Sequence, residues 1–135
     1  MMKKVFLMLA ATMIGSPALA KPVYLTCTFP GENGKSRDFS VTFDEETQSL
    51  SYTSPTGYTT KLPNVVFKAN AVVAQNTDIS SGLYTTDHWE INRATGAVSR
   101  TVKMGSVRFP DKIPEQTLTA DNGACATAKT LPRKF

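Results

Sequence analysis

The clearest fold signal lies in residues 89–102, which read WEINRATGAVSRTV. Trp89 and Ile91 alternate with polar residues, as in a strand with one buried face, and apolar residues return at the same period after Gly96. The five residues that end at Gly96 have the composition of a turn, and Gly96 stands where a three-residue hairpin loop needs a left-handed residue. These residues therefore predict a β-hairpin with one face in the core.

The same alternation recurs on both sides of this hairpin. Further strands are expected at residues 23–29, 39–43, 50–52, 65–67, 71–73, 101–109 and 115–119, separated by turn clusters such as PGENG (30–34) and SPTG (54–57). No stretch after residue 20 keeps a helical period for three turns, although a helix packed on the sheet could replace the strands within 65–74. We expect an all-β fold, either an antiparallel sandwich or a small barrel. Its core is expected to contain Phe39, Val41, Phe43, Trp89, Ile91 and Val98.

The chain contains two cysteines, Cys27 and Cys125. Their even number and wide separation favour a disulfide over a zinc site or a redox motif, which would need closely spaced cysteines. A disulfide requires Cα atoms within about 7 Å of each other. The first strand and the segment after the last strand are therefore expected to lie side by side, with the bridge closing the domain.

Residues 1–20 have the three parts of a cleavable signal peptide. Lys3 and Lys4 precede an apolar stretch, residues 5–14, and Ala18 and Ala20 form a small-residue cleavage site. We expect cleavage after Ala20, a single β domain from residue 21 to 135 with a loose C-terminal tail (131–135), and a periplasmic or secreted location. The apolar stretch is too short to cross a bilayer, and none of the required length follows it.

The charge distribution argues against a nucleic-acid partner. Without Lys3 and Lys4, the 15 Lys and Arg residues fall to 13 against 11 Asp and Glu, so the expected net charge is +2. The basic residues are scattered among acidic and polar ones, whereas nucleic-acid binding needs a concentrated basic face.

His88 is the only histidine and therefore the centre of any acid–base or metal hypothesis. Alternation places it on the face opposite Trp89, which is the solvated side of the strand. No second histidine or free thiolate completes a metal site, and no G-x-S-x-G motif marks a nucleophile. We expect no metal, no cofactor and no enzymatic activity; a small hydrolase centred on His88 is the less favoured alternative.

Residues 80–84, Ser80-Ser81-Gly82-Leu83-Tyr84, resemble the short loop motif of the periplasmic lysozyme inhibitors of Gram-negative bacteria, with one residue fewer before the tyrosine. Those inhibitors are exported, single-domain, mainly β proteins with a lone disulfide. The chain also resembles small exported bacterial β-proteins that carry a hairpin like 91–96 and a cysteine near each end. The first resemblance implies a protein that binds a lysozyme.

The combined features predict a non-catalytic binding module whose partner is another exported or envelope protein, such as a lysozyme. Exported chains without catalytic groups act through their surfaces, and loops on a rigid β scaffold commonly carry the contacts. Ser81 and Tyr84 are the expected contacts, with Arg93 at the hairpin turn as a charged anchor. The alternative is a structural, envelope-associated protein.

Overall fold

The computed structural model describes residues 21–128, which form nine β-strands and one short 3₁₀ turn, η1 (Glu32–Gly34). The strands are β1 (Val23–Phe29), β2 (Arg37–Asp44), β3 (Ser49–Thr53), β4 (Thr59–Leu62), β5 (Asn64–Phe67), β6 (Ala71–Ser80), β7 (Leu83–Asn92), β8 (Ala97–Ser106) and β9 (Gln116–Thr127). The expected signal peptide (1–20) and the expected tail (131–135) lie outside the described residues. Within residues 21–128, none of the helical structure could cross a membrane.

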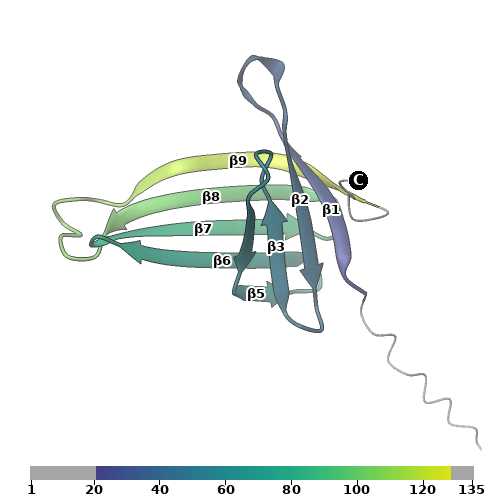
Figure 1. Ribbon diagram of the computed structural model, residues 1–135, viewed down its shortest axis with the longest axis horizontal. Coiled ribbons are helices and arrows are strands. Elements are labelled where there is room, and N and C mark those ends of the chain that lie inside the picture. The colour runs from purple at the N-terminus through teal and green to yellow at the C-terminus, as the bar shows by residue number, and fades with distance from the viewer. Residues whose placement is uncertain (1–20, 129–135) are drawn as a thin grey trace, which may run out of the picture.

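All nine strands belong to one antiparallel sheet in the order β4-β3-β2-β1-β9-β8-β7-β6-β5 (Figure 1). Every neighbouring pair except β1–β9 is also consecutive along the chain, so short connections build most of the sheet. The two outermost strands, β4 and β5, are separated only by Pro63, which lacks an N–H group for a ladder. The sheet curls into a nearly closed barrel, so the barrel alternative of the sequence prediction is the correct one.

The core lies where β1–β4 cover the ends of β6–β8 that are nearest the β7–β8 turn. In Figure 1, β2 and β3 cross in front of those ends. Trp89 is fully buried, and its indole packs against the rings of Phe29, Phe39 and Tyr52 at centroid distances of 4.8 to 5.7 Å. The six residues predicted for the core are all buried, together with Cys27, Phe29, Leu50, Tyr52, Leu62, Val72 and Ala74.

The hairpin predicted from residues 89–102 is β7–β8. Gly96 has a φ of +77°, the left-handed conformation that the turn requires, and its N–H donates to the Asn92 carbonyl at 2.8 Å. The Asn92 side chain accepts hydrogen bonds from the N–H groups of Ala94 and Thr95. The turn therefore satisfies its own polar groups, which is how an Asn at this position stabilises it.

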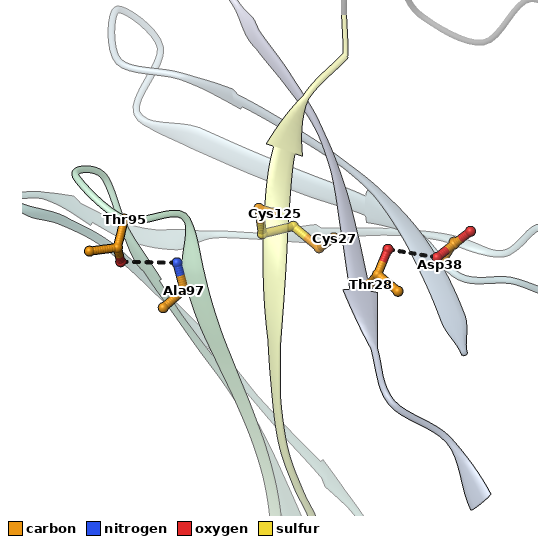
Figure 2. The surroundings of a disulfide bond; sticks show 6 residues. All are labelled: Cys27, Thr28, Asp38, Thr95, Ala97 and Cys125. Atoms are coloured by element: carbon orange, nitrogen blue, oxygen red, sulfur yellow. Dashed lines mark hydrogen bonds between the residues drawn. A yellow bond between two sulfur atoms is a disulfide. The ribbon is translucent and has the colours of Figure 1, made fainter. Parts of the chain in front are cut away.

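The disulfide joins Cys27 in β1 to Cys125 in β9, as predicted (Figure 2). The two residues are directly opposite each other in the β1–β9 register. The prediction that Cys125 follows the last strand is wrong, because β9 runs on to Thr127. The bridge therefore fastens the first strand to the last within the ladder itself, at the junction between the two halves of the sheet.

One strand boundary is corrected, and one strand was missed. The strand expected at 101–109 ends at Ser106, where the Phe109 N–H bonds back to the Ser106 hydroxyl at 3.0 Å and starts a loop. The strands expected at 65–67 and 71–73 are confirmed as β5 and the start of β6, so the alternative of a helix there is wrong. β4 has no counterpart in the sequence prediction because its residues, TTKL, carry little hydrophobic pattern.

Candidate functional site

Strands β6–β9 extend well beyond the part of the sheet that β1–β4 cover. The buried residues of β6 and β7 end at Ala74 and Trp89, and both strands continue for several residues past them. Figure 1 shows the extension as a single layer that projects away from β1–β3 and ends in the β6–β7 turn and the β8–β9 loop. A single layer exposes both faces to solvent, so side chains there are available to a partner.

The projecting end carries most of the exposed apolar bulk. Among residues 21–128, eight large apolar side chains are exposed, and two of them, Tyr58 and Val66, lie elsewhere. The other six, which we call the apolar tip, are Ile79, Leu83, Val107, Phe109, Ile113 and Leu118. Single exposed apolar residues are ordinary, but a group confined to one end of a molecule is typical of an interaction surface.

The β6–β7 turn is tight and is tied to the neighbouring loop. Ser80 pairs with Leu83, so only Ser81 and Gly82 connect the strands, and both have positive φ values, +53° and +75°. Two left-handed residues in a two-residue connection match the twist of a hairpin, and glycine adopts this conformation without strain. The Val107 N–H donates to the Gly82 carbonyl at 3.0 Å, which holds the β8–β9 loop against the turn.

The β8–β9 loop, residues 107–115, presents Phe109 from a folded backbone. The Phe109 carbonyl accepts hydrogen bonds from the N–H groups of Lys112 and Ile113, at 3.2 and 2.9 Å. The ammonium group of Lys112 lies over the Phe109 ring, 5.9 Å from its centroid. The Phe109 side chain is still 53% exposed. The loop therefore holds an aromatic side chain in place without burying it.

Tyr84 braces the base of this loop. Its hydroxyl donates to Glu115 at 2.7 Å, and this hydrogen bond is the main cause of the raised pKa of Tyr84. Lys103 also approaches Glu115, at 3.7 Å. The Tyr84 ring lies over Gly105, at a place where any Cβ would collide with it. Tyr84 therefore stabilises the base of the loop through these contacts, independently of any contact with a partner.

The structure brings two of the three predicted contact residues together. Ser81 and Tyr84 lie at the projecting end, whereas Arg93 follows the opposite end of β7, about 30 Å along the strand. There Arg93 forms an ion pair with Glu45 and donates to the Lys68 carbonyl at 3.1 Å. One contact surface of ordinary size cannot readily include all three, and Arg93 is already engaged in joining loops at its own end.

The sequence prediction missed the β8–β9 loop as part of the site. Phe109 and Ile113 are large apolar residues separated and followed by prolines, in a segment too irregular for a buried strand. This combination is the signal that could have identified them. The alternation of the hairpin instead places Phe109 at the end of an expected strand, 101–109, and leaves Ile113 between two expected strands.

His88 lies on the face of β7 opposite Trp89, as the alternation predicts. One ring nitrogen is 3.2 Å from the Gln75 amide oxygen, and the other is 4.0 Å from a Glu90 carboxylate oxygen. Together with Thr86, Thr101 and Lys103 it lines a shallow hollow of about 410 Å³. Within residues 21–128, no group of His, Cys, Asp or Glu side chains could hold a metal ion.

A half-buried polar cluster marks the border between the core and the projecting layer. Arg100 contacts Asp87 through two nitrogens at 3.1 and 3.2 Å, and the Tyr52 hydroxyl donates to Asp87 at 2.6 Å. Burial, followed by the hydrogen bond to Asp87, raises the pKa of Tyr52. For Arg100, burial lowers the pKa, but the hydrogen bond to Asp87 and its charge outweigh burial and raise it. Each polar group has a partner here, so the cluster reads as structural.

Comparison with known proteins adds no relative: no family model matches the chain, and neither does any curated protein or solved structure.

Proposed function

We propose that this protein is an exported, non-catalytic module that binds another protein through the apolar tip. The observation that carries the proposal concerns residues 21–128, in which six of the eight exposed large apolar side chains lie at the one end of the sheet that projects beyond the core. Exposing these side chains to water is unfavourable for the free protein, and a partner that covers them removes that cost.

The tip is held in shape before any partner arrives. The hydrogen bond from Val107 to Gly82 joins its two connections, and the hydrogen bond from Tyr84 to Glu115 braces the loop from below. A surface that is already ordered loses less conformational entropy on binding. This favours a binding role over a passive one for the projecting layer.

We propose a cell-wall hydrolase, such as a lysozyme, as the partner. A narrow, projecting tip fits a concave site better than a flat surface. Glycoside hydrolases have a cleft that contains a pair of carboxylic acids. The β8–β9 loop carries two cations, Arg108 and Lys112, beside its apolar side chains, and one nearby anion, Asp111. The loop's other carboxylate, Glu115, is paired with Lys103. Asp78 beside Ile79 makes the charges of this end equal in number, but Arg108 and Lys112 lie in the loop itself, where they can face the acids of such a cleft.

The test compares a tip variant with a matched variant elsewhere. Phe109→Ser removes an aromatic side chain from the tip, and Val66→Ser removes an apolar side chain of nearly equal exposure from β5. The purified proteins are used to capture partners from envelope and culture extracts, and are assayed against lysozymes of several types. Phe109→Ser is expected to lose the partner or the inhibition, because aromatic anchors contribute strongly to interfaces, whereas Val66→Ser keeps it.

The outcomes separate the alternatives. Equal loss in both variants, or loss in neither, contradicts docking through the tip. Full activity of all lysozymes at saturating protein contradicts the inhibitor proposal even where a different partner is captured. A hydrolytic activity of the protein itself that His88→Ala abolishes, with the fold intact, would replace the binding proposal by the enzymatic one.

A further inference from the structure

β9 is an interior strand at one end and an edge strand at the other. Its residues 124–127 pair with residues 25–28 of β1, and β1 ends at Phe29. From residue 116 to residue 123, its only strand partner among the described residues is β8. We call the vacant position beside this part of β9 the open lane. Figure 1 shows the corresponding side of β9 without a neighbouring strand over the projecting layer.

Two hydrogen bonds show which backbone groups face the open lane. The Ala128 N–H donates to Tyr24 on the β1 side, and the Cys125 N–H donates to Gly96 on the β8 side. In an antiparallel strand, the N–H and C=O groups of one residue point to the same side, and those of the next residue point to the other side. Since Ala128 bonds toward β1 and Cys125 toward β8, the even-numbered residues face the lane. The bulge opposite Val102 and Lys103 interrupts this pattern near Leu118. Ala120 and Asn122 therefore present their N–H and C=O groups to the lane.

The lane is flanked by a groove on each face of the sheet. The outer groove, about 450 Å³, is lined mainly by small residues, among them Pro30, Gly34 and Ala124. The inner groove, about 540 Å³, contains Lys35, Arg37, Leu118 and Asp121, and Arg37 bonds to Asp121 there at 2.9 Å. Both grooves lie between β9 and the β1–β2 loop (30–36), which leaves the lane after Phe29.

We propose that the open lane accepts an extended segment of another polypeptide as an added strand, bonded through Ala120 and Asn122. Alternating backbone donors and acceptors at strand spacing are complementary to another extended backbone. β1 already occupies the same lane beside residues 124–127, so the spacing is that of a normal ladder. The segment alternates a small apolar side chain for the outer groove with a polar one for Lys35, Arg37 and Asp121.

A second copy of the chain fits the lane less well than an unrelated segment. Pairing of two β9 strands about Ala120 would put the partner copy's residue 116 opposite Ala124. Thr28 already occupies that position. A short segment that ends beside Asn122 avoids this collision.

The test uses the disulfide-bonded protein and an acetylated, amidated pentapeptide of alternating threonine and valine as the probe. Amide hydrogen exchange, followed by NMR during a peptide titration, is expected to show saturable protection of the Ala120 and Asn122 amides. Ala120→Pro removes the N–H group that faces the lane and leaves the β8 ladder its donors, so it should bind about tenfold more weakly. Ala120→Val keeps the N–H group and should bind like the parent.

Two controls keep the result interpretable. Trp89 fluorescence reports whether each variant retains the core. A pentapeptide that is N-methylated at all five residues loses the backbone donors of both its edges and should bind more weakly to the unaltered protein, which tests the ladder even where Ala120→Pro does not fold.

Three results would overturn the inference. The first is that the Ala120 and Asn122 amides gain no protection at millimolar peptide. The second is that the peptide protects the Thr77 and Ile79 amides of β6 instead, and the third is that protection rises with protein concentration when no peptide is present. The proposal shares only Leu118 with the apolar tip and does not use Phe109. Phe109→Ser should leave the peptide binding unchanged, so the failure of either proposal is visible separately.

Discussion

The two ends of β7 follow the same alternating pattern but have different environments. Near the β7–β8 turn, Trp89 and Ile91 are buried under β1–β4, whereas Leu83 at the other end of the same face is exposed. Both ends have β6 and β8 as neighbours, so hydrogen bonding within the sheet is the same. The difference comes from the second layer, which covers only one end. Pairing makes a strand, but a covering layer makes a core.

The largest loss of stability should come from the covered end. Trp89→Ala leaves a large cavity among three aromatic rings and should lower the free energy of unfolding by about 3 to 5 kcal/mol. Trp89→Phe should cost less, because it keeps an aromatic ring and removes an indole N–H that has no hydrogen-bond partner among the described residues. Denaturant unfolding measures both. A Trp89→Ala variant as stable as the parent would contradict the assigned core.

The disulfide should be the next largest contribution. Its cysteines are 98 residues apart, and a bridge that closes so long a loop restricts the unfolded chain, with removal of a native bridge typically costing about 2 to 5 kcal/mol. Unfolding of Cys27→Ala/Cys125→Ala, compared with the oxidised parent, measures this cost. Free-thiol labelling of the denatured, unreduced parent should find no reactive thiol; two labelled cysteines would show that the bridge does not form.

The polar cluster at the border between the two ends should give an intermediate effect. Arg100→Met keeps much of the side-chain volume but leaves the half-buried Asp87 carboxylate without its cation, so we expect a loss of about 1 to 3 kcal/mol. Arg37→Met removes the more exposed ion pair with Asp121 and should cost about 1 kcal/mol or less. Equal costs for the two variants would show that the covering layer does not shield Arg100.

Tyr52 should make the stability of this cluster dependent on pH. Its pKa is raised in the folded protein, so its contribution is complete below its unfolded pKa of about 10 and falls as the pH rises through the folded value. The stability difference between the parent and Tyr52→Phe should therefore shrink in alkaline solution. Paired unfolding curves from neutral to alkaline pH measure it; a constant difference would contradict the raised pKa.

The smallest effect should come from the uncovered end. Phe109→Ser and Ile79→Ser replace side chains that are 53% and 68% exposed, so each should change the free energy of unfolding by about 0.5 kcal/mol or less. Thermal unfolding checks this. A large loss would mean that the tip is part of the folded core, and the comparison between the two ends would fail.

The core was predictable from the sequence because its residues combine strong alternation with large apolar side chains. Phe39, Val41, Phe43, Trp89, Ile91 and Val98 all lie where their pattern places them. The same pattern misassigned residues 107–109 and could not locate the end of β9, because alternation indicates which face a side chain takes and not whether another layer covers it. Ser81 and Tyr84, which are predicted contacts, lie at the projecting end. Phe109 and Ile113 lie there too but were not predicted, because alternation does not show which apolar residues are left uncovered.

The sequence by itself determined an all-β domain, its core residues, the β7–β8 hairpin and the partnership of two cysteines, since these depend on local periodicity, turn chemistry and an even cysteine count. Only the tertiary structure decided that the sheet is a nearly closed barrel, that Arg93 lies far from Ser81 and Tyr84, and that β6–β9 project beyond the core. These features depend on which strands of the sheet become neighbours and on how far each strand extends beyond the end of the neighbouring strand. Both are set by contacts between residues distant in sequence, which local periodicity does not encode.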